Sequence, residues 1–186
     1  MILASASPRR RELLALAGFD FTVETAAVEE TYDPALPPAK IVMHLAAVKS
    51  EPVARLHPNE PVIGADTVVV LDEAILGKPR DAQDAAAMLR RLSGRVHQVY
   101  TGVCLRRGEK SVCFHECTLV RFKELSDELI AAYVATGEPM DKAGAYGAQG
   151  LAALFVAHID GDFFNVMGLP LCLLGRMLNQ QGVELL

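Results

Sequence analysis

Hydroxyl and guanidinium side chains gather at the start of a predicted helix near the beginning of the sequence. The stretch SASPRR places Ser5, Ser7, Arg9 and Arg10 directly after a short apolar segment. Proline is favoured at the first helical position, and the first turn carries unpaired N–H groups and the positive end of the helix dipole. With two guanidinium groups added, such a turn can bind an anion, most naturally a phosphate. The alternative is a capped helix with solvated arginines. The stretch is not a P-loop, because it has no glycine-rich GKS or GKT sequence.

A single carboxylate interrupts one of the most apolar segments of the chain. Asp66 lies in VIGADTVVVLD, and burying a charge among such residues is costly unless it has a partner. Gly64, two residues earlier, permits a bulge or the close approach of another backbone. Asp66 is therefore a candidate catalytic base or magnesium ligand. The alternative is a strand end at which Asp66 meets solvent.

Lysines and a pair of glutamates could complete a polyphosphate site. Lys49 lies on an otherwise apolar side of a predicted helix, Lys78 precedes a proline, and Lys142 lies in a glycine-rich segment. Each alone is more typical of a solvated surface, but together with the arginines they could surround several phosphates. Glu29 and Glu30 are adjacent where a predicted strand ends, and two carboxylates near a phosphate site could hold magnesium through oxygen ligands.

Helical and strand patterns interleave along the chain, which predicts an α/β protein with a mixed, twisted sheet flanked by helices. The first strand (2–5) leads into the anion-binding turn, and the apolar strand 61–72 carries Asp66. The turn RRGEK predicts an antiparallel hairpin. Residues 137–150, rich in glycine and without periodicity, are expected to form a long functional loop. Helices are expected at 8–17, at 39–56 with a kink or break at Pro52, at 82–94, from Ser126, and at 171–181.

The composition is that of an ordinary soluble globular protein. The 186 residues suggest one domain over 1–186 that folds without disulfides, with 51% hydrophobic and 22% charged residues. The formal net charge of −5 argues against nucleic-acid or membrane-surface partners. No apolar run reaches the roughly 18 residues of a membrane span, and basic residues follow the first apolar stretch, so no signal peptide is expected. These features predict a cytoplasmic protein.

The four cysteines form no CxxC pair, and free thiols in the core are expected. The stretch CFHEC puts Cys113, His115 and Cys117 on one face of a strand, where they could hold zinc, although no fourth ligand is evident. Small apolar cysteines on a half-buried strand are the alternative. His97 is interpreted as a structural, hydrogen-bonded histidine in preference to a catalytic one.

Several stretches, taken in order, resemble the Maf family of nucleotide pyrophosphatases. They span nearly the whole chain and keep the order found in the family, which makes the set highly specific. The matching stretches are LASASPRR (3–10), VEET (28–31), VIGADTVV (62–69), LGKP (76–79), LSGRVHQVYTGV (92–103), GEPMDKAGAYGAQG (137–150) and NVMGLPL (165–171).

The resemblance implies an α/β fold with two lobes and an active-site cleft between them, often as a homodimer. It also implies hydrolysis of nucleoside triphosphates to the monophosphate and pyrophosphate, with a divalent cation, Mg²⁺ or Mn²⁺, as cofactor. By the same resemblance Asp66 is the proton acceptor, and Glu30 matches a family glutamate that is assigned here to the metal. The residues that match phosphate-contacting and conserved basic positions of the family are Ser5, Ser7, Arg9, Arg10, Lys49 and Lys78.

Three positions indicate the substrate branch within the family. Arg9, Thr67 and Gln149 match the branch that acts on dTTP and UTP, whereas the 7-methyl-GTP branch tends to differ there. The resemblance therefore implies a house-cleaning enzyme for dTTP and UTP. Ala148 departs from the family pattern, which commonly has a bulkier apolar residue such as isoleucine, so a slightly looser loop is expected.

Other hypotheses stay open at this point. The protein could be a nucleotide-binding regulator of cell division, because the family is linked to inhibition of septum formation; a regulator would bind nucleotide without releasing pyrophosphate. It could also be a pyrophosphatase for another base such as 7-methyl-GTP, or a broad triphosphatase of the inosine-triphosphate type. A panel of nucleotides separates these enzymes.

Overall fold

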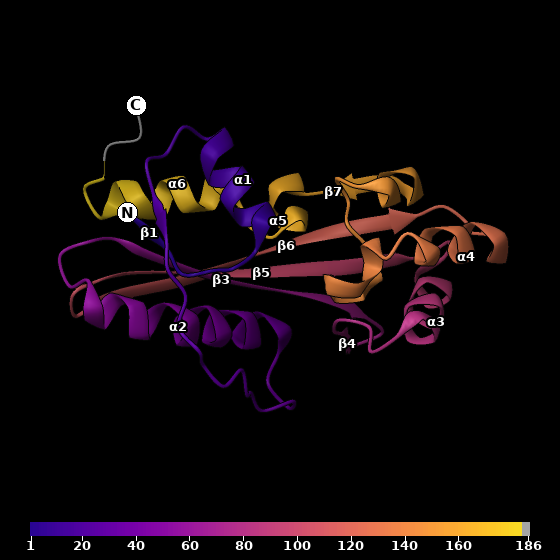
Figure 1. Ribbon diagram of the computed structural model, residues 1–186, viewed down its shortest axis with the longest axis horizontal. Coiled ribbons are helices and arrows are strands. Elements are labelled where there is room, and N and C mark those ends of the chain that lie inside the picture. Colours follow the sequence, from indigo (N-terminus) through magenta and orange to yellow (C-terminus); the bar gives the residue numbers. More distant parts are fainter. Residues whose placement is uncertain (184–186) are drawn as a thin grey trace. The chain divides into compact units, whose positions relative to one another are not determined.

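The computed structural model describes residues 1–183 and contains a seven-stranded mixed sheet with helices beside it (Figure 1). The strand order is β2-β1-β3-β5-β6-β7, with β4 paired to β3. β1 is parallel to β2 and β3, whereas β4 is antiparallel to β3, and β7 is antiparallel to β6. The predicted α/β class with a mixed sheet is confirmed.

The strands are β1 (Ile2–Leu3), β2 (Thr22–Val23), β3 (Val62–Leu71), β4 (Ala74–Leu76), β5 (Val96–Arg107), β6 (Lys110–Phe122) and β7 (Val156–Asp160). The α-helices are α1 (Pro8–Leu16), α2 (Pro38–Leu56), α3 (Ala82–Leu92), α4 (Asp127–Ala135), α5 (Phe163–Met167) and α6 (Leu171–Gln180).

The chain divides into two compact units. Of the described residues, unit 1 comprises Met1–Thr67, Thr101–Glu116 and 168–183, and unit 2 comprises Val68–Tyr100 and Cys117–Met167. Strands β3, β5 and β6 contribute residues to both units. The expectation of one domain over 1–186 stays a prediction, and residues 184–186 of it lie outside the described residues.

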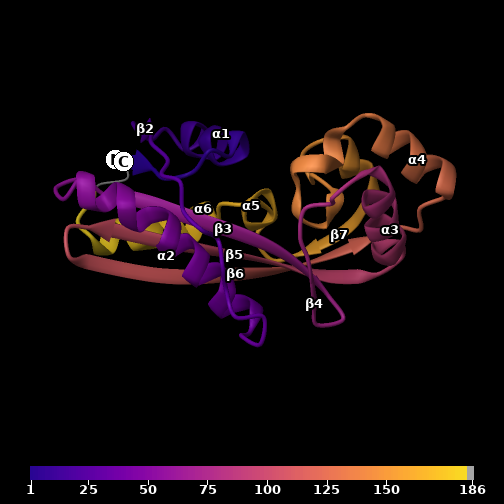
Figure 2. The ribbon, with the colours of Figure 1, turned by 60° about the horizontal axis from the view of Figure 1, so that its bottom comes forward.

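Two glycines let a helix lie close against the sheet in unit 1. Helix α2 lies on one face of the strands and α6 on the other (Figures 1 and 2). A Cβ atom at Gly64 of β3 would lie 2.8 Å from Ser50 Cβ and nearer still to the carbonyl oxygen of Ala46, both on α2. A Cβ at Gly102 of β5 would likewise lie 2.6 Å from the backbone nitrogen of Met43. The missing side chains therefore permit the short distance between α2 and the sheet.

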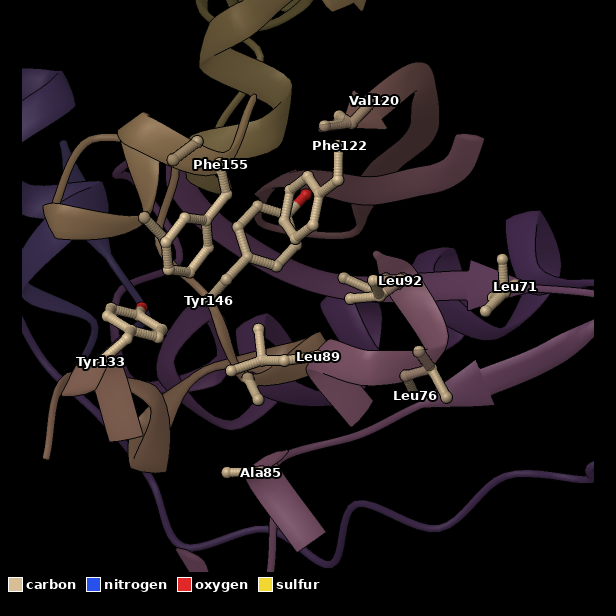
Figure 3. Packing of buried hydrophobic residues seen from close by; sticks show 14 of the residues in the cluster. Leu71, Leu76, Ala85, Leu89, Leu92, Val120, Phe122, Tyr133, Tyr146 and Phe155 are labelled. Atoms are coloured by element: carbon tan, nitrogen blue, oxygen red, sulfur yellow. The ribbon is translucent and has the colours of Figure 1, made fainter. Parts of the chain in front are cut away.

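Aromatic rings organise the core of unit 2 (Figure 3). Phe122 and Tyr146 meet edge to face with ring centroids 4.8 Å apart, and Tyr133 and Phe155 do so at 4.9 Å. Leu89 of α3 is completely buried in the same cluster. Such edge-to-face pairs add directional attraction to the burial of apolar area. The core thereby fixes the segment around Tyr146, which belongs to the glycine-rich stretch 137–150.

The two helix starts predicted in unit 2 are confirmed by their caps. The Asp81 carboxylate accepts a hydrogen bond from the Asp84 amide at 2.8 Å before α3, and the Ser126 hydroxyl accepts one from the Leu129 amide at 3.2 Å before α4. Each cap satisfies one of the unpaired N–H groups of a first turn. The hairpin predicted at RRGEK is also present, with β5 and β6 joined at residues 108–109.

The glycine-rich segment 137–150, predicted as a long loop, contains two short 3₁₀ helices. Its residues form the short 3₁₀ helices η1 (Glu138–Asp141) and η2 (Ala143–Ala145), and η3 (Leu151–Phe155) follows at once. Single 3₁₀ turns leave no helical periodicity in the sequence, because each is only one turn long. Gly137 and Gly144 have φ values of 76° and 68°, which glycine adopts without steric cost and which bend the chain between turns.

A kink or break was expected at Pro52; the break is wrong, because α2 is one helix from Pro38 to Leu56, and the kink stays a prediction. Proline removes one helical hydrogen bond. Buried apolar side chains occur on both sides of it, including Leu45 and Val53, and their burial offsets that loss.

The expectation that all four cysteines are free thiols is also wrong. Cys104 of β5 and Cys113 of β6 form a disulfide, whereas Cys117 and Cys172 are free. The hairpin makes β5 and β6 neighbours and brings the two Cα atoms to 4.1 Å, a proximity that residue spacing alone did not reveal. Among the described helices, none has the length and apolar character needed to cross a membrane.

His97 is a buried structural histidine, as interpreted from the sequence. It is 2% exposed, its Nε2 lies 2.8 Å from the Tyr146 hydroxyl, and its ring meets Phe122 edge to face at 5.0 Å. Its Nδ1 has no hydrogen-bond partner in the described residues. Burial lowers the pKa of His97 from 6.5 to about 4, because the charged imidazolium would lose its hydration.

This pKa predicts a pH-dependent stability. The unfolded chain binds a proton at His97 below about pH 6.5 and the folded chain only near pH 4, so stability falls as the pH drops through this interval. The loss reaches about 3 kcal/mol when both states are protonated. Urea unfolding of the wild type and of His97→Gln between pH 7.5 and 4 measures it. The stability difference between the two proteins should shrink toward low pH, while the exposed His158→Gln control should follow the wild type. An unchanged difference would contradict the assignment.

Candidate active site

The guanidinium of Arg10 connects three segments of unit 1. Its Nε donates to the carbonyl oxygen of Gly168 at 2.7 Å. One terminal nitrogen donates to Ser5 Oγ at 3.0 Å and the other to Thr67 Oγ1 at 3.1 Å. Thr67 Oγ1 in turn lies 2.9 Å from the hydroxyl oxygen of Thr101. Arg10 therefore joins the turn after β1, the middle of β3 and the segment that precedes α6.

Arg10 is a buried positive charge. It is only 9% exposed, and burial lowers the pKa of its guanidinium below the usual value. The negative charge of Asp66 opposes this shift in the pKa of Arg10, and the positive charge of Arg9 adds to it. An arginine nevertheless stays protonated in proteins. The site thus contains a fixed positive charge. Arg10 donates its hydrogen bonds to hydroxyl and carbonyl groups, and the negative charge of Asp66 acts on it.

Lys49 lies between two carboxylates. Its Nζ is 2.6 Å from Asp66 Oδ1 and 2.8 Å from Glu30 Oε2. Asp66 is 9% exposed, whereas the Glu30 side chain is 52% exposed. The cluster therefore leads from a buried strand to the surface. Within residues 1–183 the second oxygen of Asp66, Oδ2, accepts no hydrogen bond, so it is able to accept a proton from a ligand or from water.

The alternation of side chains along β3 explains how two adjacent residues, Asp66 and Thr67, contact Lys49 and Arg10 respectively. Successive side chains of a strand leave opposite faces of the sheet. Asp66 and Gly64 share the face toward α2, and the bare surface at Gly64 allows α2 to bring Lys49 to Asp66. Thr67 leaves the other face, where it contacts Arg10 of α1. The sequence GADT thereby supplies one residue to each side of β3.

The start of α1 lies where the sequence predicts a helix start, and its binding of an anion stays a prediction. Ser7 occupies the N-cap and Pro8 the first helical position. The Ser7 side chain makes no cap hydrogen bond, and the first turn contains no acidic residue, so its hydroxyl and the positive helix end are available to an anion. The Ser7 amide donates to Ser5 Oγ at 3.3 Å, and Arg9 is half-buried.

The structure brings eight of the ten predicted site residues together in unit 1: Ser5, Ser7, Arg9, Arg10, Glu30, Lys49, Asp66 and Thr67. Lys78 and Gln149 belong to unit 2 and are exposed. In the described part of the chain neither side chain forms a hydrogen bond or an ion pair with another residue, so both are available to a ligand.

Lys142, the third candidate lysine, is occupied within its own segment. Its Nζ donates to the Glu138 carbonyl oxygen at 2.6 Å and to Asp141 Oδ1 at 2.7 Å. The side chain is 13% exposed. Lys142 therefore has a structural role in the segment 137–150.

Glu29, the neighbour of Glu30 in the sequence, has an exposed side chain.

Two groups of the Arg10 cluster were not predicted from the sequence, the hydroxyl of Thr101 and the carbonyl of Gly168. Thr101 is completely buried, and a carbonyl group has no signature in a residue pattern. Both residues lie in stretches that carry the family resemblance, YTGV and NVMGLPL, which was the available signal.

The zinc hypothesis has no support in unit 1 or unit 2. Cys113 is bonded to Cys104, which removes one of the three proposed ligands. Across residues 1–183, no three His, Cys, Asp or Glu side chains are arranged to hold a metal ion by themselves. A cation at the Asp66 and Glu30 carboxylates would therefore need further oxygen ligands from a bound molecule or from water.

Comparison with known proteins identifies relatives over almost the whole chain. A family model described as Maf-like protein matches residues 1–181. The dTTP/UTP pyrophosphatase of Bacillus cytotoxicus is 54% identical over 96% of this chain and 94% of its own. The dTTP/UTP pyrophosphatase of Symbiobacterium thermophilum is 53% identical over 98% of this chain and 94% of its own.

One solved structure has a similar fold. The Staphylococcus aureus Ham1 protein superposes with a TM-score of 0.57 over 97% of this chain and 98% of that chain, at 14% sequence identity. At that identity the likeness concerns the fold alone, and it agrees with the mixed α/β architecture.

Gly64→Ala tests whether close packing of α2 on β3 builds the lysine–carboxylate cluster. The new methyl group would collide with Ala46 and Ser50, and overpacking of this kind costs typically about 1–3 kcal/mol. We expect that loss in urea unfolding, because α2 has to move away from β3 and takes Lys49 away from Asp66. Gly77→Ala is the matched control for stability, since a Cβ there meets nothing within 4 Å. Equal stability of the two variants would refute the close-packing argument.

Proposed function

Because the chain belongs to the Maf-like protein family, we propose that it hydrolyses dTTP and UTP to the nucleoside monophosphate and pyrophosphate. This reaction removes nucleoside triphosphates from the nucleotide pool. The observation that carries the proposal is the cluster of Asp66, Lys49 and Glu30, in which the charges of Asp66 and Glu30 act on the buried guanidinium of Arg10. It combines a candidate base with positive charge for phosphates.

The phosphate chain would bind to the positive groups around the start of α1. The helix end, the Ser7 hydroxyl and Arg9 supply donors for phosphate oxygens. Ser5 and Arg10 bond to each other, and remaining N–H groups of the Arg10 guanidinium can reach a phosphate while the existing bonds hold it in place. Lys49 and Lys78 are proposed as further phosphate contacts.

A divalent cation, Mg²⁺ or Mn²⁺, fits the donor set of the cluster. Glu30 and Asp66 direct carboxylate oxygens at one positive group, the Lys49 ammonium, and hard oxygen donors are what these ions prefer. Glu30 is the proposed metal ligand, and phosphate oxygens and water would supply the remaining ligands of the ion. When bound, the ion neutralises charge that develops on the phosphates.

Asp66 is proposed as the base of the reaction. Water attacks the α-phosphorus, the bond from that phosphorus to the oxygen bridging to the β-phosphorus breaks, and pyrophosphate leaves with the electron pair. Asp66 takes the proton from the attacking water through its unpaired Oδ2. Its Oδ1 is held by Lys49 at 2.6 Å, which orients the carboxylate.

Base selection is assigned to Arg9, Thr67 and Gln149. The Gln149 amide can donate to a carbonyl oxygen and accept from the N3–H group of uracil or thymine. Thr67 is proposed to act on base selection indirectly: its hydroxyl accepts a hydrogen bond from Arg10 and so helps to position Arg10 and the adjacent Arg9. A site built to pair polar base groups rejects other bases, because its own groups then lose their partners.

The proposal includes a homodimer in the cytoplasm with a small-molecule nucleotide as substrate. The dimer rests on the family resemblance and the location on the sequence pattern. The net charge of −5 gives no electrostatic reason for a nucleic-acid or membrane-surface partner.

Asp66→Asn tests the reaction. The amide keeps the shape of the side chain but cannot take the proton, so we expect turnover of dTTP to fall at least about 10²-fold, within the ~10²–10⁴ that a positioned base supplies. Pyrophosphate release from dTTP, UTP, CTP, GTP and 7-methyl-GTP, with Mg²⁺ or Mn²⁺, measures this. Glu109→Gln, an exposed carboxylate of the hairpin turn, is the control.

Near-normal turnover by Asp66→Asn would reject the base. Release from 7-methyl-GTP alone would keep the reaction and reject the pyrimidine assignment. Nucleotide binding by the wild type without any release would favour a regulator over an enzyme.

Gln149→Ala tests base selection. Truncation leaves the base edge without its amide partner, so kcat/KM for dTTP should fall roughly tenfold or more and the preference for dTTP over CTP should diminish. The same nucleotide panel measures both quantities. Folding should be unaffected, because the Gln149 side chain is exposed. A variant that keeps the wild-type preference would show that Gln149 does not select the base.

A further inference from the structure

Gln149 lies in a four-residue turn that begins and ends with glycine. The Gly150 amide donates to the Gly147 carbonyl oxygen at 3.0 Å, so Gln149 is the third residue of this turn. Ala148 is 5% exposed and belongs to the core of unit 2. The turn is therefore anchored at Ala148, and the neighbouring Gln149 side chain is exposed.

The carboxylate of Glu138 lies against one end of this turn. Its Oε2 accepts a hydrogen bond from the Leu151 amide at 3.1 Å, and its Oε1 accepts one from the Tyr133 hydroxyl at 3.0 Å. A Cβ at Gly150 would lie 2.7 Å from Glu138 Cδ and 2.9 Å from its Oε2. A side chain at position 150 would therefore displace the Glu138 carboxylate from its place against the turn.

The hydroxyl of Tyr133, which donates to Glu138, keeps its proton. Burial raises the pKa of Tyr133 above its usual value, and the adjacent negative charge of Glu138 raises it further. Tyr133 is 3% exposed and its ring packs on Phe155, so its hydroxyl is fixed in the core of unit 2. The Glu138 carboxylate thus links a rigid core residue to the backbone that follows Gln149.

Lys142 holds the other end of the turn. A Cβ at Gly147 would lie 2.7 Å from Lys142 Cε, so the lysine methylene groups cover that glycine. The Lys142 ammonium also donates to the Glu138 carbonyl oxygen at 2.6 Å. Both glycines that flank Ala148 and Gln149 are therefore contacted by side chains of one short segment, Glu138 to Lys142.

An orienting device is needed because an amide is not selective by itself. Turned one way, it donates to a carbonyl oxygen and accepts from N3–H of uracil or thymine. Turned over, it accepts from the amino group of cytosine and donates to its N3. Rotation about Cγ–Cδ interchanges the two patterns, so selection requires the amide to be held at one distance and one angle to the base, and the turn 147–150 sets the position from which the Gln149 side chain reaches that base.

We infer that Glu138 is a positioning residue for base discrimination, which holds the turn 147–150 so that Gln149 meets a uracil or thymine edge. The inference rests on the proposed function of Gln149. Glu138 itself does not touch the nucleotide. Its effect passes through the Leu151 amide and the backbone of Gly150.

The test compares Glu138→Ala with Glu138→Gln and with Glu128→Ala, a control that removes an exposed carboxylate from α4 of the same unit. We expect Glu138→Ala to lower the ratio of kcat/KM for dTTP over CTP about tenfold, chiefly through a higher KM for dTTP. Glu138→Gln should retain most of the ratio, because its amide oxygen still accepts from Leu151. Glu128→Ala should retain all of it.

Two further measurements separate positioning from a general loss of structure. In the Gln149→Ala background, Glu138→Ala should cause little further change in the dTTP to CTP ratio, because both substitutions remove the same orientation. Hydrogen exchange at the Leu151 amide should accelerate in Glu138→Ala and stay slow in Glu138→Gln. An unchanged ratio in Glu138→Ala, or an equal further loss in the Gln149→Ala background, would overturn the inference.

The outcomes also distinguish this inference from the proposed function. If the wild type releases no pyrophosphate from any nucleotide, the proposed reaction fails, and the ratio of Kd values for dTTP and CTP replaces the kinetic ratio. Faster Leu151 exchange with a lower Kd ratio in Glu138→Ala would then still support the positioning role. An unchanged Kd ratio would overturn it.

Discussion

The buried guanidinium of Arg10 is the interaction on which the site in unit 1 depends. A charge that is 9% exposed is tolerated only when hydrogen bonds and a counter-charge compensate its lost hydration. Ser5, Thr67 and the Gly168 carbonyl accept its hydrogen bonds, and they come from three separate parts of the chain. Removing any one partner leaves part of a buried cation unsatisfied. The position of Arg10 is thereby tied to the correct folding of all three segments.

Close packing adds the second requirement, that α2 lies almost on the backbone of β3. The contact depends on the absence of a side chain at Gly64. It also brings the ammonium group of Lys49, which belongs to α2, within hydrogen-bond distance of Asp66. Asp66, which lies within the apolar strand β3, thereby has Lys49 as a charged partner. Burial of apolar residues around the pair strengthens their attraction, since the surroundings are less polarisable than water.

Sequence patterns predicted the local structure of unit 1 better than the contacts between its segments. Ser7, Pro8 and the apolar run around Asp66 are local signals, and the structure bears out the helix start and the buried strand. The Arg10 bonds to Thr67 and Gly168 span 57 and 158 residues, and no local pattern encodes them. The disulfide and the continuous α2 were likewise missed, because tertiary pairing and core burial override a local preference. The short 3₁₀ turns of 137–155 leave no period to detect.

Charge balance explains why Lys49 stands between two carboxylates. Asp66 and Glu30 would repel each other if they shared a site without a cation, and the ammonium removes that repulsion. In the proposed reaction Lys49 keeps Asp66 Oδ1 in place, while the Glu30 side chain, which is 52% exposed, faces solvent. Asp66 is 9% exposed and lies within β3. This difference in exposure supports the proposed roles, in which Glu30 is a metal ligand that a cation reaches from solvent and Asp66 is a base fixed in the strand.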